Sequence, residues 1–127
     1  MVNIMVVDDE PAVITTIKQG FDMLTDRYKV LGVNSGKECI EILKEGGKPD
    51  IILLDIMMPD LDGWQVYDIL KKNEEWSEIP VIFITAKDDE ETIKKGIETN
   101  TYCVRKPFKI KELKDKIERV LSEDFDF

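Results

Sequence analysis

The chain has 127 residues, which is enough for one hydrophobic core and about one domain. Its 18 Lys and Arg face 27 Asp and Glu, and the formal net charge of −9 argues against direct binding of nucleic acid by the whole surface. The absence of His excludes every His-dependent catalytic or zinc site. Carboxylates, hydroxyls, Lys and Cys are therefore the available reactive groups.

The cysteines and the apolar runs predict a cytoplasmic protein without membrane association. Cys39 and Cys103 lie far apart with no CxxC spacing, so neither a disulfide framework nor a metal cluster is indicated. No signal peptide is visible at the start of the chain. The longest apolar stretches are far below the roughly 20 residues needed to span a bilayer.

The first apolar run and the segment after it predict a strand followed by a helix. The strand covers residues 4–7. Pro11 follows three acidic residues, and both features are typical of a helix N-terminus. Spacings of three and four then predict one buried helix face, formed by Val13, Ile14, Ile17, Phe21 and Leu24.

The next strand and helix carry clearer boundary signals. Tyr28–Val33 is the predicted strand. Ser35 and Glu38 stand three residues apart, as a capping box requires, and Gly46 with Gly47 ends the helix that they begin.

Three further strands are predicted in the second half, at residues 51–54, 80–85 and Tyr102–Arg105. The run at 51–54 is apolar on both sides of the pleat, which is typical of a strand covered on both faces. A helix over 88–97 has a thin apolar spine. The helices on either side of it carry apolar residues at helical spacing: Val66, Ile69 and Leu70 before it, and Ile110, Leu113, Ile117, Val120 and Leu121 after it.

Five strands alternating with five helices predict an α/β fold in three layers, with a parallel sheet covered by helices on both faces. Of the doubly wound strand orders, 2-1-3-4-5 suits five strands and makes strands 1 and 3 neighbours. Ligand sites in such sheets lie beyond the carboxyl ends of the strands.

Chemically useful side chains follow the strands at this edge. Asp8 and Asp9 follow strand 1, Asp55 follows strand 3, Thr85 ends strand 4 and Lys106 follows strand 5. Two charges 4 Å apart interact by ~4 kcal/mol at an effective dielectric of 20, so three converging carboxylates need a cation. A few carboxylates with several waters suit Mg²⁺ better than a full calcium cage.

The same residues suit phosphoryl chemistry. A carboxylate can attack phosphorus to form an acyl phosphate, and Asp55 is the best nucleophile candidate because it faces the Asp8 and Asp9 pair. Lys106 and the Thr85 hydroxyl are good partners for phosphoryl oxygens. A merely structural origin for all five residues at the correct strand ends is improbable.

With these residues in place, the sequence resembles the receiver domain of two-component response regulators, the CheY-like family, over residues 2 to about 122. The resemblance implies the flavodoxin-like fold, whose strand order is the one predicted above. Four segments carry it: Val6 to Glu10; Leu54 to Pro59 with Asp62 and Gly63; Thr85 with Ala86; and Lys106 to Phe108.

The resemblance implies roles for individual residues. Asp55 would accept a phosphoryl group from a histidine kinase or phosphotransfer protein. Asp9, Asp55 and the Met57 backbone carbonyl would coordinate Mg²⁺, and Asp8 would act through water. Thr85 and Lys106 would bind the phosphoryl oxygens, so the domain would modify only itself and would not be an enzyme for another substrate.

The resemblance also implies an output. The surface made by the helix over 88–97, the strand Tyr102–Arg105 and the last helix would change and control a partner that the sequence does not identify. We expect a receiver domain over residues 1–122 and a short polar tail over 123–127. No effector domain is visible, so we expect a protein that acts alone or an excised module.

One position departs from the family pattern. The family usually has Tyr or Phe three residues before the strand 5 Lys, and that position here is Cys103. Tyr102 comes one residue early, and because side chains alternate across a strand it should point to the opposite face. Either Tyr102 or Cys103 would then accompany Thr85 as the switch residue.

Three other functions fit the sequence less well. A phosphatase of the haloacid dehalogenase type needs a second Asp two residues after the nucleophile, where this chain has Met57. A receiver-like interaction domain would have lost its acceptor and metal residues, and none is lost. A nucleotide-binding flavodoxin-like role would need a glycine-rich loop after strand 1, which is missing.

Overall fold

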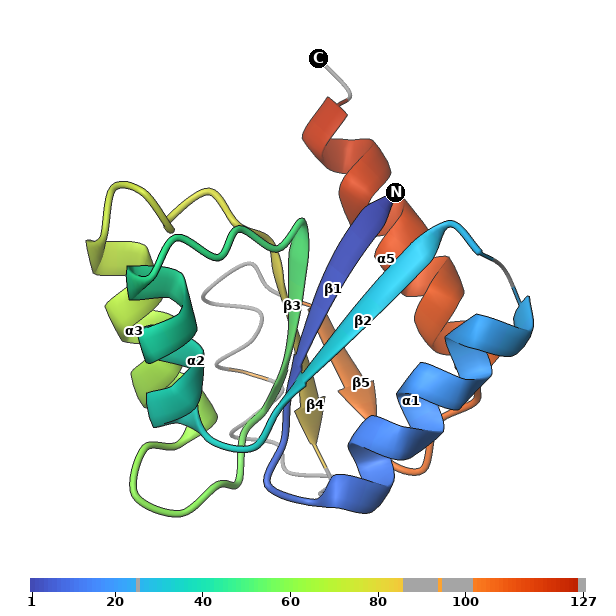
Figure 1. The fold of residues 1–127 in the computed structure, drawn as a ribbon, viewed down its shortest axis with the longest axis horizontal. Helices are drawn as coiled ribbons and strands as arrows, with labels where there is room; N and C mark the ends of the chain where they lie inside the picture. Colours follow the sequence, from blue (N-terminus) through green and yellow to red (C-terminus); the bar gives the residue numbers. More distant parts are fainter. Residues whose placement is uncertain (25, 86–93, 95–101, 126–127) are drawn as a thin grey trace.

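The computed structural model describes residues 1–24, 26–85, 94 and 102–125; for residues 123–125 it describes the backbone only. Its centre is a sheet of five parallel strands in the order β2-β1-β3-β4-β5, which confirms the predicted order (Figure 1). The strands are β1 (Val2–Val7), β2 (Tyr28–Val33), β3 (Ile51–Asp55), β4 (Val81–Thr85) and β5 (Tyr102–Arg105).

Helices cover both faces of the sheet, as predicted (Figure 1). Within the described ranges four helices are present, and the predicted helix over 88–97 falls, apart from Lys94, outside those ranges. Helices α2 and α3 cover one face, and α1 and α5 cover the other. Their bounds are α1 (Pro11–Leu24), α2 (Gly36–Lys44), α3 (Gly63–Lys72) and α5 (Ile110–Phe125).

The sheet separates two apolar clusters. Met5, Leu54 and Phe83 belong to the cluster under α2 and α3, whereas Ile4 and Ile84 belong to the one under α1 and α5. Side chains on one strand alternate between the clusters because a strand has a period of two. Every residue of β3 is buried, which confirms that this strand is covered on both faces.

The helix boundaries follow local hydrogen bonding. Helix α1 begins at Pro11 as predicted. The Ser35 side chain accepts a hydrogen bond from the Glu38 backbone N–H at 3.1 Å, which confirms the predicted cap of α2. The Glu38 carboxylate accepts from the Asn34 N–H rather than from Ser35, so only half of the expected reciprocal pair forms.

One predicted core position is wrong. Leu24 is the last residue of α1 and is half exposed, although its spacing extends the buried face. One turn earlier, the Phe21 ring packs against the Tyr28 ring with 5.2 Å between their centroids. These two rings close that end of the core and leave Leu24 outside.

The start of α3 is packed directly on the end of β3, a contact that the sequence pattern did not predict. A Cβ atom at Gly63 would lie 2.4 Å from the Asp55 carbonyl oxygen and 2.7 Å from the Ile56 Cα. The Gly63 N–H donates to the Ile56 carbonyl at 2.9 Å. Asp62 and Gln65 form a complete capping box just beside it. Gly63 therefore allows the helix to sit against the strand end that carries Asp55.

No helix among the described residues is long and apolar enough to cross a membrane.

Gly63→Ala should lower the free energy of unfolding by about 1–3 kcal/mol, because the added methyl group would meet backbone atoms that cannot rotate away. Urea unfolding followed by circular dichroism measures the change. Asp68→Ala, at an exposed position of the same helix, is the control and should stay within about 0.5 kcal/mol of wild type. A Gly63→Ala midpoint equal to wild type would contradict the close approach.

Candidate functional site

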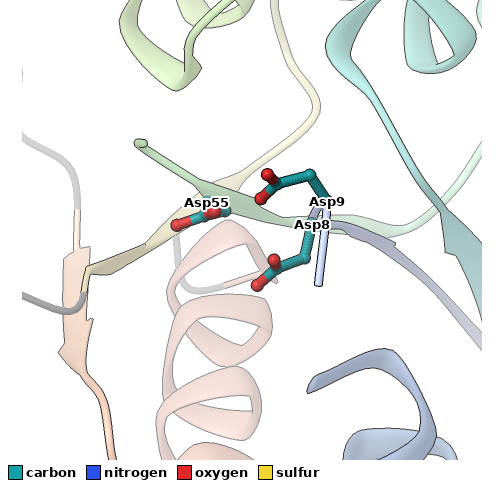
Figure 2. Close-up of side chains that lie close together, drawn as sticks. All are labelled: Asp8, Asp9 and Asp55. Carbon is teal, nitrogen blue, oxygen red and sulfur yellow. The ribbon is translucent and has the colours of Figure 1, made fainter. Parts of the chain in front are cut away.

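Three carboxylates meet at the carboxyl edge of the sheet. Asp8 and Asp9 directly follow β1, and Asp55 is the last residue of the neighbouring strand β3. Figure 2 shows the three side chains close together, with Asp8 and Asp9 diverging from the end of β1. One ligand oxygen from each lies within 4.8 Å of the others. Asp8 and Asp55 are buried, and Asp9 is exposed.

Lys106 brings one positive charge into this cluster. Its Nζ atom lies 2.9 Å from Asp8 Oδ2 and 3.6 Å from Asp55 Oδ1, so the long side chain reaches from β5 to the centre of the sheet edge. A fourth acid also meets it, because Glu10 Oε1 lies 3.5 Å away. The sequence placed Glu10 only at the start of a helix, and its contact with Lys106 was not predicted.

Asp8 is held by the backbone around it. Its N–H donates to the Val33 carbonyl at 3.0 Å, and its Oδ1 accepts from the Glu10 N–H at 2.9 Å. The other oxygen, Oδ2, is buried and lies 2.9 Å from the Lys106 Nζ atom. The Lys106 ammonium therefore meets this oxygen as an ion pair.

The electrostatics of the cluster disfavour a charged Asp55. Burial raises the pKa of Asp55 to about 7, the Asp8 carboxylate adds to the rise, and Lys106 opposes it. Burial acts against the charge of Lys106 as well, but Asp8, Asp55 and Glu10 outweigh it and raise the pKa of the ammonium. Among the described residues, the Lys106 ammonium thus leaves negative charge in the site uncompensated.

This excess charge suits a divalent cation. Hard carboxylate oxygens are the ligands that Mg²⁺ prefers, and an exposed Asp9 leaves room for the waters that this ion retains. Asp8, Asp9 and Asp55 therefore fit a Mg²⁺ ion.

Two further predicted residues lie around Asp55. Thr85 is buried at the end of β4, and its carbonyl accepts from the Lys106 N–H at 2.8 Å, which ties the two strand ends together. The Met57 backbone N–H donates to the Asp55 carboxylate and opposes the rise of its pKa. The Met57 side chain is exposed, and its carbonyl as a metal ligand stays a prediction.

The register of β5 separates the two candidate switch residues. Tyr102 pairs with Ile82 and packs on the α1 and α5 side, whereas Cys103 pairs with Phe83 and packs on the α2 and α3 side. Cys103 also lines a cavity of about 380 Å³ together with Thr85 and Lys116. Tyr102 thus points to the face opposite Cys103, as its one-residue offset predicted.

The family model of the response regulator receiver domain matches residues 4–118. This chain belongs to that family. The solved structure of the receiver domain of the Francisella response regulator 1452 superposes with a TM-score of 0.83 at 27% identity, over 97% of this chain and 98% of that one. The chemotaxis protein CheY4 of Vibrio cholerae has a TM-score of 0.83 at 20% identity, over 94% and 98% of the two chains, and supports the fold alone.

Curated relatives of this receiver domain are longer proteins. The transcriptional regulatory protein PcoR of Escherichia coli is 34% identical over 95% of this chain and 52% of its own length. A probable cyclic di-GMP phosphodiesterase of Vibrio cholerae is 37% identical over 90% of this chain and 25% of its own length. The receiver domain thus spans between a quarter and about half of these relatives.

Asp55→Asn should raise the free energy of unfolding of the receiver domain by about 1–3 kcal/mol at neutral pH in a buffer with a metal chelator. In the unfolded chain Asp55 is ionised at this pH, so folding has to bury a charge that the Asn lacks. Added Mg²⁺ should stabilise the wild type more than the variant.

The control for this measurement is Asp62→Asn, because Asn also caps a helix and α3 should keep its stability. Urea unfolding with and without Mg²⁺ gives all values. An Asp55→Asn variant less stable than the wild type would contradict the proposed electrostatics. So would Mg²⁺ that stabilises Asp55→Asn as much as it stabilises the wild type and Asp62→Asn.

Proposed function

We propose that this receiver domain accepts a phosphoryl group on Asp55 from a histidine kinase or a phosphotransfer protein. The proposal rests on the buried Asp55 carboxylate, which lies beside the Lys106 ammonium and two further aspartates. Burial and like charge make this carboxylate less stable as an anion than one in water. Removal of its hydration favours attack on an electrophile.

In the proposed step, an Asp55 oxygen forms a bond to phosphorus. The phosphorus–nitrogen bond of a phosphohistidine breaks, and its electron pair stays with the leaving imidazole. The printed sequence has no His, so this donor lies outside the 127 residues. The product is an acyl phosphate, as in enzymes that use an aspartyl phosphate.

The remaining site residues would hold the group that moves. Asp9, Asp55 and the Met57 carbonyl would bind Mg²⁺ directly, and Asp8 would bind it through water. When bound, the ion would supply positive charge to the oxygens of the phosphoryl group. Lys106 and the Thr85 hydroxyl would each contact a phosphoryl oxygen, since Thr85 ends the neighbouring strand β4 and the Lys106 Nζ atom lies 3.6 Å from Asp55 Oδ1.

The conformational change caused by phosphorylation would pass from the end of β4 to the edge strand β5. Cys103 shares the cavity of about 380 Å³ with Thr85, so a Thr85 side chain that moves inward would change the space beside Cys103. The Lys116 ammonium of α5 donates to the Cys103 carbonyl at 2.8 Å. We therefore assign the switch position to Cys103 rather than Tyr102, and the output surface to the 88–97 segment, β5 and α5.

The proposed output is a change in how this surface binds a protein partner. We infer a cytoplasmic domain of residues 1–122 that controls a protein partner and does not itself bind nucleic acid, with the acidic net charge as support. This role is the same whether the domain acts alone or inside a longer regulator. The domain would modify only itself.

Incubation with acetyl phosphate and Mg²⁺ should add one base-labile phosphoryl group to the wild-type domain. Asp55→Asn should abolish this labelling, because the amide oxygen is a far weaker nucleophile. Intact-protein mass spectrometry measures the addition. Asp62→Asn, an equal charge change outside the carboxylate cluster, should be labelled as the wild type is. Undiminished labelling of Asp55→Asn would refute Asp55 as the acceptor.

Thr85→Val should keep the acceptor carboxylate but remove the hydroxyl that is proposed to follow the phosphoryl group. On addition of trifluoroberyllate, a phosphoryl mimic, the wild-type backbone amides of Cys103 and Lys116 should change their NMR chemical shifts. In Thr85→Val these changes should shrink by at least half while those next to Asp55 persist. Equal changes at Cys103 in both proteins would contradict coupling through Thr85.

A further inference from the structure

Lys106 has an exposed acidic neighbour in addition to the two buried ones. The Glu10 carboxylate lies 3.5 Å from Lys106 Nζ, and its side chain is 61% exposed, against 13% for Lys106 and 0% for Asp8. Glu10 therefore meets the ammonium from the solvent side. None of the acceptor, metal or switch roles proposed above uses Glu10.

The position of Glu10 is set by its backbone. Its N–H donates to Asp8 Oδ1 at 2.9 Å, and helix α1 begins at the next residue, Pro11. The side chain lines an open cavity of about 430 Å³ together with Val13, Lys106 and Phe108. Glu10 thus contacts Lys106 where that side chain faces this open cavity, and not from among the buried aspartates.

Phosphorylation makes the site more negative. A phosphoryl group on a side chain carries close to two negative charges near neutral pH, whereas the free Asp55 carboxylate carries one. The extra charge draws the Lys106 ammonium toward the new oxygens. Glu10 holds the same ammonium and adds a negative charge of its own beside it. Its carboxylate therefore opposes the phosphorylated state.

Resting on the function proposed above, we propose that Glu10 is a positioning residue for phosphoryl transfer. Its carboxylate competes with the phosphoryl oxygens for Lys106 and so favours the unphosphorylated domain. A phosphoryl group can shift the domain to its phosphorylated conformation only by binding that conformation better than the resting one. Glu10 reduces this difference because it stabilises Lys106 in the resting position. Because the pair is partly exposed, its loss should change an equilibrium constant by about two- to five-fold.

The test compares the wild type with Glu10→Gln, which keeps the shape of the side chain and removes its charge. Acetyl phosphate with Mg²⁺ gives the initial rate of labelling, in which an Asp55 oxygen bonds to phosphorus and acetate leaves with its electron pair. Titration with trifluoroberyllate gives the affinity for a phosphoryl mimic. Both are measured at about 20 mM and about 0.5 M salt, because salt screens partly exposed charges.

At low salt, Glu10→Gln should be labelled about two to five times faster and should bind trifluoroberyllate more tightly by a similar factor. At high salt both ratios should fall toward one, which a purely structural effect of the substitution would not produce. Glu41→Gln removes one charge from an exposed position of α2 and should match the wild type at both salt concentrations.

The role of Glu10 would be overturned if Glu10→Gln were labelled no faster than the wild type. It would also be overturned if the ratio of the two labelling rates were the same at both salt concentrations, or if Glu41→Gln showed the same gain. Such results would leave the proposed function intact as long as the wild type is labelled and binds the mimic. A wild type that does neither would instead refute the proposed function, and this inference with it.

Discussion

Two neighbouring strand ends bury like charges, and the electrostatics of the whole site follow from this burial. Asp8 and Asp55 are both buried, and in the part of the chain that the structure describes only the Lys106 ammonium lies within ion-pair distance of both. Burial of unpaired charge is costly, so such a cluster persists only where a cation or a ligand offsets it. The raised pKa of Asp55 and the fit to Mg²⁺ are two consequences of this one arrangement.

The fold makes the arrangement possible. The parallel order places β1 beside β3, so the acids that follow these strands meet although 46 positions of sequence separate Asp9 from Asp55. The lack of a side chain at Gly63 lets α3 start against the Asp55 carbonyl. At the other end of the sheet edge, the Thr85 carbonyl fixes the Lys106 backbone, from which the side chain reaches inward.

Sequence reasoning succeeded where a feature depends on periodicity or on strand order. It predicted the five strands, the cap at Ser35 and the meeting of Asp8, Asp9, Asp55 and Lys106, because alternation and parallel topology determine them. It failed where the outcome depends on tertiary packing. Leu24 follows the helical pattern but is exposed, because the Phe21 and Tyr28 rings pack together at the end of the core beside it. The Glu10 contact depends on the rotamer of a long side chain, which no spacing rule contains.

We propose that the electrostatics of this cluster make Asp55 the phosphoacceptor. The most direct measurement is chemical mapping of the modified residue in the unaltered protein. Borohydride reduces an aspartyl phosphate to homoserine, and peptide mass spectrometry then locates it after treatment with acetyl phosphate and Mg²⁺. We expect homoserine at position 55 and nowhere else. Homoserine at another acidic residue, or at none, would contradict it.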